Sequence, residues 1–163
     1  MTDTKRNTGI SALASTFTFG VELETIINND TAMANGLRIG DYHNGIQVPY
    51  LPEGWTAERD GSLQCRYPNV PCEIVSPILK GPEGIKELIK VIKTLKQKGH
   101  KVNISCGVHS HIGFSNKSAA ELAKLITIVS YLERGLYAIT GTKSRERGDW
   151  CESICQFSRK IGT

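Results

Sequence analysis

Two pairs of residues in the sequence combine residue types and a spacing that suit metal binding. Glu22 and Glu24 are separated by one leucine, and His109 and His111 are separated by one serine. On a β-strand, residues i and i+2 share a face and lie roughly 6.6 Å apart. Two carboxylates this close repel each other, a cation relieves that repulsion, and oxygen ligands suit Mg²⁺ or Mn²⁺. Imidazole suits zinc and many other metals. The alternative for each pair is an ordinary solvated strand face.

Three further features contain residue types that could complete such a site. Glu73 interrupts the otherwise apolar segment 72–77, so it is either a ligand or a residue on the solvated face of a strand. Arg145 and Arg147 follow a predicted helix, and paired arginines can hold phosphate oxygens through bidentate hydrogen bonds. Ordinary surface charge is the alternative for these arginines. Asp60-Gly61-Ser62 is a turn signal in its own right.

An alternating pattern predicts the strand that carries the two glutamates. Between Thr16 and Ile26, apolar residues at every second position define a buried face, and Glu22 and Glu24 belong to the opposite face. The apolar residues of this strand are Phe17, Phe19, Val21 and Leu23. The other predicted strands are 55–60, 72–77, 101–106 and 109–113, with a short strand at 46–48 inside a long loop over 28–52. A loop of that length is often functional.

Two long helices are predicted between and after these strands. In the first, over Pro82 to Gly99, proline suits the first turn and glycine suits the C-terminal cap. The second begins at Ser118, where Glu121 completes a capping box. The apolar residues expected on their core faces are Ile85, Leu88, Ile89, Ile92 and Leu95, and Leu122, Leu125, Ile126, Val129, Leu132 and Leu136. Residues 151–160 are compatible with a third, short helix.

The order of elements favours an α+β fold with an antiparallel sheet, because strands and helices do not alternate as regular βαβ units. The length of 163 residues fits one domain. Residues 1–15 are polar and small, and they predict a flexible N-terminus before a single domain over 16–163.

Composition argues against several classes of partner. The net charge of +4 is too small to indicate a nucleic-acid partner. The lysines between Lys80 and Lys101 follow the solvated side of an amphipathic helix, and a polyanion-binding patch would contain aromatic or arginine residues among them. No apolar run approaches 18 residues, so no membrane partner is expected. Five cysteines without a secretory signal indicate reduced thiols and a cytoplasmic location.

The order of these motifs resembles the amidoligase family of the carboxylate–amine ligase superfamily, which includes glutamine synthetase and glutamate–cysteine ligase. The resemblance covers about residues 17–147. The motifs that carry it are Phe-Gly-Val-Glu-Leu-Glu at 19–24, Trp55 with Asp60-Gly61-Ser62, Glu73-Ile74-Val75-Ser76-Pro77, a helix ending at Gly99, and the segment 102–113 with its two histidines.

The resemblance implies a glutamine-synthetase-like antiparallel sheet whose concave face binds ATP, divalent metal ions and the substrates. It implies that ATP phosphorylates a carboxylate of a glutamate-like amino acid or peptide, and that an amine then displaces the phosphate to give an amide. The implied cofactors are ATP and Mg²⁺ or Mn²⁺. The implied partners are a small-molecule or peptide carboxylate and an amine, and a homo-oligomer is compatible with the sequence.

Site residues follow from the resemblance position by position. The expected metal ligands are Glu22, Glu24, Glu73 and His109. The expected nucleotide-binding residues are Ser62, His111, Arg145 and Arg147. The expected catalytic residues are the four metal ligands together with Arg145.

Two alternatives remain beside the ligase. Members of the family are usually longer, so the domain is expected to be incomplete relative to the family, and the chain could be a non-catalytic relative that binds nucleotide or metal. A metal-dependent hydrolase using His109 and His111 would need further ligands, and His43 and His100 are poorly placed to supply them.

Overall fold

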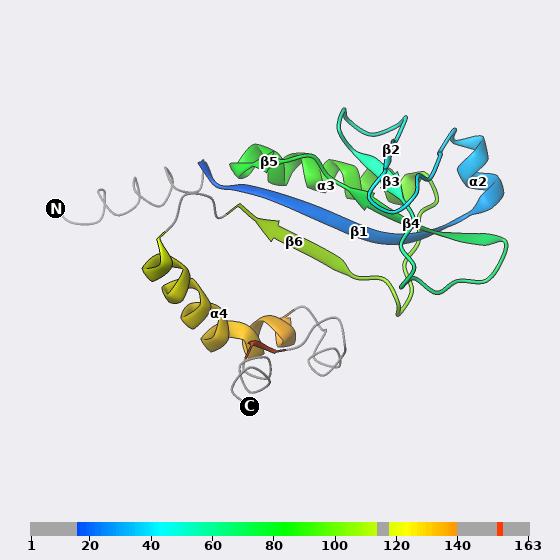
Figure 1. Ribbon diagram of the computed structural model, residues 1–163. Coiled ribbons are helices and arrows are strands. Elements are labelled where there is room, and N and C mark those ends of the chain that lie inside the picture. Colours follow the sequence, from blue (N-terminus) through cyan, green and yellow to red (C-terminus); the bar gives the residue numbers. More distant parts are fainter. Residues whose placement is uncertain (1–15, 114–117, 140–152, 155–163) are drawn as a thin grey trace. The chain divides into compact units, whose positions relative to one another are not determined.

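A long strand, β1 (Thr18–Asn28), lies at the centre of the first part of the molecule (Figure 1). The computed structural model describes residues 16–113, 118–139 and 153–154, which belong to two units, 1–113 and 114–163. In the described part of the first unit, six strands form one sheet whose strand pairings are all antiparallel. The remaining strands are β2 (Ile46–Gln47), β3 (Thr56–Glu58), β4 (Asn69–Val75), β5 (Leu79–Lys80) and β6 (Val108–Ile112).

Strand β1 holds the sheet together because three strands pair with it. It pairs with β5 near its start, with β6 from Phe19 to Leu23, and with β4 from Glu22 to Asn28. Strand β4 pairs in turn with β3, and β3 pairs with β2. The predicted antiparallel sheet is therefore confirmed, and β1, β3, β4 and β6 lie close to their predicted positions.

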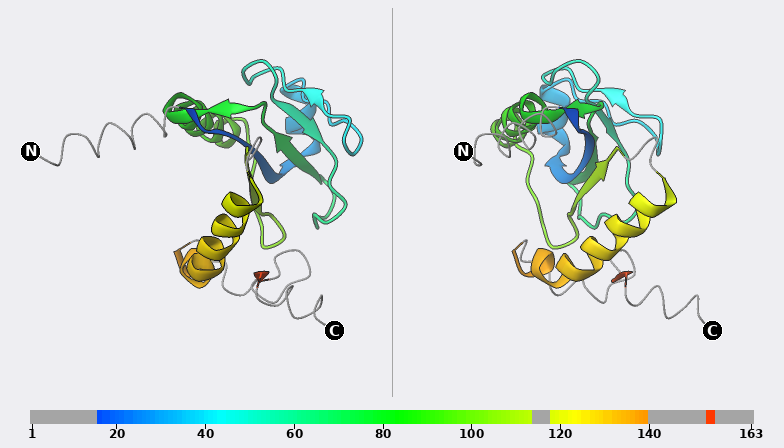
Figure 2. Two further views of the ribbon diagram at one scale, coloured as in Figure 1. Left: turned by 60° about the vertical axis from the view of Figure 1, so that its left-hand side comes forward. Right: turned by 90° about the vertical axis from the view of Figure 1, so that its left-hand side faces the viewer.

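The hydrophobic core lies on the apolar face of this sheet. Val21 and Leu23 of β1 are buried, as their alternation with the glutamates predicts, and Ile74 of β4 is fully buried. Helix α3 (Gly81–Gln97) supplies Val91 and Leu95 to the same core. It runs alongside β1 in Figure 1 and is seen nearly end-on beside the sheet in Figure 2. Glu22, Glu24 and Glu73 lie on the opposite face of the sheet.

Helix α3 confirms the predicted helix and corrects its buried side. Pro82 lies in the first turn, and Gly99 follows the C-cap with a φ of 89°. The predicted core stripe is partly wrong, because Ile85, Ile89 and Ile92 are 44–48% exposed. The predicted Leu95 is buried and the predicted Leu88 packs against the core, together with Gly84 and Val91, which are not in the predicted stripe. Both stripes have helical spacing, and only the sheet beneath the helix decides which one is buried.

Helix α2 (Asn29–Ala34) lies inside the segment for which the sequence predicts a long loop. The side chain of Asn28 caps it by accepting hydrogen bonds from the N–H groups of Asp30 and Thr31. Six residues are too few to show helical periodicity, and asparagine is as typical of turns as of helix caps. The short strand predicted at 46–48 is present as β2.

The predicted strand at 101–106 is wrong. Only Lys101 bridges β1, at Ile26, and Ile104 is 96% exposed. Asn103 bends the chain here, because its side chain accepts hydrogen bonds from the N–H and the hydroxyl of Ser105. This local hydrogen bonding competes with strand pairing.

The second unit contains helix α4 (Ala119–Ile139). Its predicted capping box is present: the Glu121 carboxylate accepts from the N–H of Ser118, whose hydroxyl accepts from the N–H of Glu121. Several of its predicted core residues, among them Leu122 and Leu136, are 38–51% exposed. None of the described helices is long and apolar enough to cross a membrane. The N-terminal residues 1–15 and all but residues 153–154 of the predicted helix at 151–160 lie outside the described residues.

Candidate functional site

Two histidines of β6 face Glu22 of β1 across the sheet. The register places His109 opposite Glu22 and His111 opposite Gly20. His109 Nδ1 lies 2.9 Å from one Glu22 carboxylate oxygen, and His111 Nε2 lies 3.0 Å from the other. Burial lowers the pKa of His109, but the Glu22 hydrogen bond and the charges of Glu24, Glu22 and Glu73 outweigh it and raise the pKa above its ordinary value. The two histidines therefore fix both oxygens of Glu22.

Glu24 is buried and held by the backbone of Gly107. Its carboxylate accepts a hydrogen bond from the Gly107 N–H, and its own N–H donates to the Gly107 carbonyl over 3.1 Å. The other carboxylate oxygen lies 3.5 Å from His109 Nε2. The glycine before the histidines thus orients the second glutamate.

Glu73 is a buried carboxylate to which no other described side chain or N–H group donates a hydrogen bond. It lies on β4 directly opposite Glu24 and is only 5% exposed. Burial is the main cause that raises its pKa to about 7, and the charges of Glu22, Asp60 and Glu58 raise it further, whereas His109 lowers it. Its carboxylate oxygens receive no hydrogen bond among the described residues and keep some contact with solvent, so a cation can reach them.

Oxygen and nitrogen atoms converge on Glu73 in two overlapping groups. Glu22, Glu73 and His109 bring one ligand atom each to within 4.8 Å of one another, and Glu24, Asp60 and Glu73 form the second such group. The first group combines carboxylates with imidazole, which suits Mn²⁺ and other transition metals, and the second offers only oxygen, which suits Mg²⁺. The donor set therefore fits divalent cations, with Glu73 common to both groups.

Asp60 and Glu58 are the residues of this face that the sequence did not assign to it. Asp60 accepts a hydrogen bond of 2.6 Å from the N–H of Ser62, so it forms the predicted turn as well as the second acidic group. Glu58 lies on β3 opposite Glu73, is 7% exposed, and accepts a hydrogen bond from the His43 N–H. Glu58 and Asp60 have the same i, i+2 spacing as Glu22 and Glu24, which was the signal available in the sequence.

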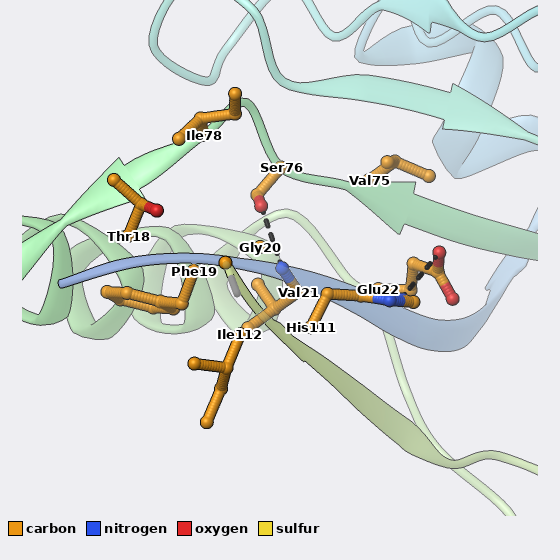
Figure 3. A pocket seen from close by; sticks show the side chains of 11 residues that line it. Thr18, Phe19, Gly20, Val21, Glu22, Val75, Ser76, Ile78, His111 and Ile112 are labelled. Carbon is orange, nitrogen blue, oxygen red and sulfur yellow. Dashed lines mark hydrogen bonds and ion pairs between the residues drawn. The ribbon is translucent and has the colours of Figure 1, made fainter. Parts of the chain in front are cut away.

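A shallow cavity of about 260 Å³ continues this face beyond Glu22 and His111 (Figure 3). Gly20 forms part of its floor, and a Cβ there would lie 3.6 Å from Ser76 Oγ, which is an ordinary contact. The Ser76 hydroxyl oxygen accepts a hydrogen bond from the N–H of Val21, where β4 leaves β1. Open space therefore adjoins the histidine-bearing group on the same face.

The remaining predicted residues do not join these groups in the described structure. Ser62 is exposed in the turn after Asp60. Arg145 and Arg147 lie outside the described residues. His100 is buried, where Thr25 and Tyr50 contact its ring. Of the predicted metal ligands, Glu22, Glu73 and His109 lie together, and Glu24 lies with Asp60 and Glu73.

Comparison with known proteins assigns the chain to a family. Neither the curated proteins nor the solved structures gave a match. A family model described as "Putative amidoligase enzyme" matches residues 15–160, which is nearly the whole chain. The match includes every strand and helix described above. The chain belongs to the amidoligase family.

Proposed function

We propose that the chain is an ATP- and divalent-cation-dependent ligase that joins a carboxylate to an amine. The observation that carries the proposal is Glu73, a residue only 5% exposed whose carboxylate receives no hydrogen bond from the described residues and is shared by two groups of metal-type ligands. Membership of the amidoligase family supports ligase chemistry. The proposed fold is that of the glutamine-synthetase-like enzymes, for which the antiparallel sheet with acids on one face is the supporting feature.

The proposed reaction has two steps. A carboxylate oxygen of the substrate attacks the γ-phosphorus of ATP, and ADP leaves, which gives an acyl phosphate. The amine then attacks the acyl carbon, phosphate leaves, and the nitrogen loses a proton. Divalent cations, when bound, would offset the charge of the phosphates, because phosphoryl transfer is catalysed mainly by positioning and charge stabilisation.

Each residue of the face has a proposed part in this site. Glu22, Glu73 and His109 would hold one cation, and Glu24 and Asp60 would hold a second together with Glu73. His111 fixes Glu22 through its Nε2 atom, so its contribution to metal binding is to orient that ligand. Gly107 does the same for Glu24 through its N–H group. These contacts keep the ligands ordered before a cation enters.

Turnover tests the proposal directly. The full chain is incubated with ATP and Mg²⁺ or Mn²⁺ and a mixture of amino acids, small peptides and amines, and ADP and phosphate are followed. We expect ADP release that requires both a carboxylate and an amine, and we expect Glu73→Gln to abolish it. Glu53→Gln is the control, because Glu53 is exposed outside the acidic groups.

Other outcomes would replace the proposal. Binding of nucleotide without ADP release would indicate a non-catalytic relative. Hydrolysis of added esters or phosphoesters without ATP would indicate a hydrolase. Unchanged ADP release in Glu73→Gln would remove this residue from the active site.

A further inference from the structure

A second cavity, of about 460 Å³, lies between α2, the segment that follows it, and the loop between β3 and β4. Within the described part of the chain, its polar lining consists of Asn29 and residues 59–61. The rest of its lining is apolar and consists of Ala32, Met33, Leu37, Ile39, Val70 and Pro71. Cavities of this size and character bind small molecules whose apolar part is buried and whose polar group is recognised at one place.

Backbone hydrogen bonds fix the walls of this cavity. The N–H of Leu37 donates to the carbonyl of Ala32, which ties the segment after α2 to the helix. The N–H of Arg59 donates over 3.0 Å to the carbonyl of Gly40, which ties the loop after β3 to the segment that follows α2. A cavity whose walls are already ordered loses little conformational freedom when a ligand enters.

Among the described residues, Arg59 is the only cationic residue that lines the cavity. Its side chain is exposed, and no carboxylate of the described residues forms an ion pair with it. Asp60 also lines the cavity, but its carboxylate accepts a hydrogen bond from the Ser62 N–H and belongs to the acidic group of Glu24 and Glu73 rather than pairing with Arg59. A guanidinium beside an apolar cavity is suited to a carboxylate attached to a hydrocarbon body.

We propose that this cavity binds an aliphatic or aromatic carboxylic acid, with its body against the apolar walls and its carboxylate on Arg59. Asp60 lines the cavity and also belongs to the second acidic group, so the bound acid lies next to that group. Its role as the pocket that selects the carboxylate substrate rests on the proposed ligase function. Binding of the acid does not.

The experiment measures binding without nucleotide or metal, so that it is independent of turnover. The full chain is titrated with 3-phenylpropionate and with its uncharged analogue 3-phenylpropanamide, by ligand-observed NMR or calorimetry. We expect the acid to bind at millimolar concentration or below and the amide to bind more weakly. Arg59→Gln should weaken binding of the acid on the order of tenfold, which is typical of a charged hydrogen bond. Arg66→Gln is the control, because Arg66 is exposed on the same loop but does not line the cavity.

A second variant tests the location of the ligand. Gly61 lines the cavity, and a Cβ built there meets no atom within 4 Å, so Gly61→Leu should fold and occupy the opening. We expect this variant to reduce binding of both compounds. Gly135→Leu is the matched control, because Gly135 has equally open surroundings on α4. The proposal is wrong if 3-phenylpropionate does not bind, or if Arg59→Gln and Gly61→Leu bind it as tightly as the wild type does. Binding without ADP release would leave the cavity assigned and the ligase function refuted.

Discussion

At the scale of single residues, stability and function oppose each other at Glu73. The residue is only 5% exposed, its carboxylate receives no hydrogen bond within the described residues, and it lies among other carboxylates. Such a group destabilises the protein in the absence of a cation, because burying a charge without a partner is costly. Glu73 belongs to both ligand groups, so a bound cation would supply the missing partner and offset this loss of stability.

This conflict predicts opposite effects of Glu73→Gln with and without metal. In EDTA the variant should be more stable than the wild type by roughly 1–3 kcal/mol, because a neutral amide replaces a buried carboxylate. Addition of Mn²⁺ should raise the melting temperature of the wild type and leave that of the variant nearly unchanged. Thermal unfolding followed by circular dichroism measures both. A variant that is less stable in EDTA, or that Mn²⁺ stabilises as strongly as the wild type, would contradict this view of Glu73.

The sequence predicted only part of the charged face for a physical reason. Glu22 and Glu24 could be assigned to one face because the period of a strand is local. Glu58 and Asp60 have the same spacing, but the sequence does not show that they approach Glu73, because this depends on the pairing of β3 with β4, which places Glu58 opposite Glu73 shortly before Asp60. A register is set by pairing between distant segments, and no short stretch of sequence contains it.

At the scale of elements, most strands and the long helices could be predicted from local sequence pattern. The predictions that were wrong concern segments in which two patterns compete. The segment 101–106 alternates like a strand, yet Asn103 forms a local turn with Ser105. Helix α3 has overlapping apolar stripes with the same spacing, and packing on the sheet buries Val91 rather than Ile92 beside the shared Leu95. In both places the sequence gives the conformational options, and tertiary contacts select among them.

Gly99, which follows the C-cap of helix α3, provides a test of how much the end of this helix contributes to stability. It has a φ of 89°, and a Cβ there would lie 2.9 Å from Thr31 Cγ2 of α2. We expect Gly99→Ala to lower the free energy of unfolding by about 1–2 kcal/mol, because alanine is strained in the left-handed region and crowds that methyl group. Urea unfolding measures the difference. Gly61→Ala is the control and should be nearly neutral, because a Cβ at Gly61 meets no atom within 4 Å. Equal stability of the two variants would contradict the expected strain.

At the scale of the described sheet, the same strand serves both faces. Even-numbered residues of β1 such as Glu24 face the acidic groups, and odd-numbered residues such as Thr25 face the buried side. On that side the Thr25 hydroxyl donates to the Cys72 carbonyl over 2.9 Å. Thr25 Oγ1 must then accept from Nδ1 of His100, so His100 Nε2 accepts from the Tyr50 hydroxyl over 2.7 Å. This network requires a neutral imidazole.

The His100 network predicts that folding stability falls in mild acid. Burial lowers the pKa of His100 from 6.5 to about 4, so between these values the unfolded chain binds the proton and the folded protein does not. Stability from this residue is therefore complete above pH 6.5 and is lost as the pH falls towards 4, which amounts to about 2 kcal/mol at about pH 5. Protonation would also turn Nε2 into a donor facing Tyr50.

Urea unfolding of the wild type and of His100→Gln at several pH values isolates this contribution from that of the carboxylates, because the carboxylates titrate in both proteins. The variant should be less stable at neutral pH and lose less stability on acidification. Parallel pH profiles for the two proteins would show that His100 does not determine the acid sensitivity.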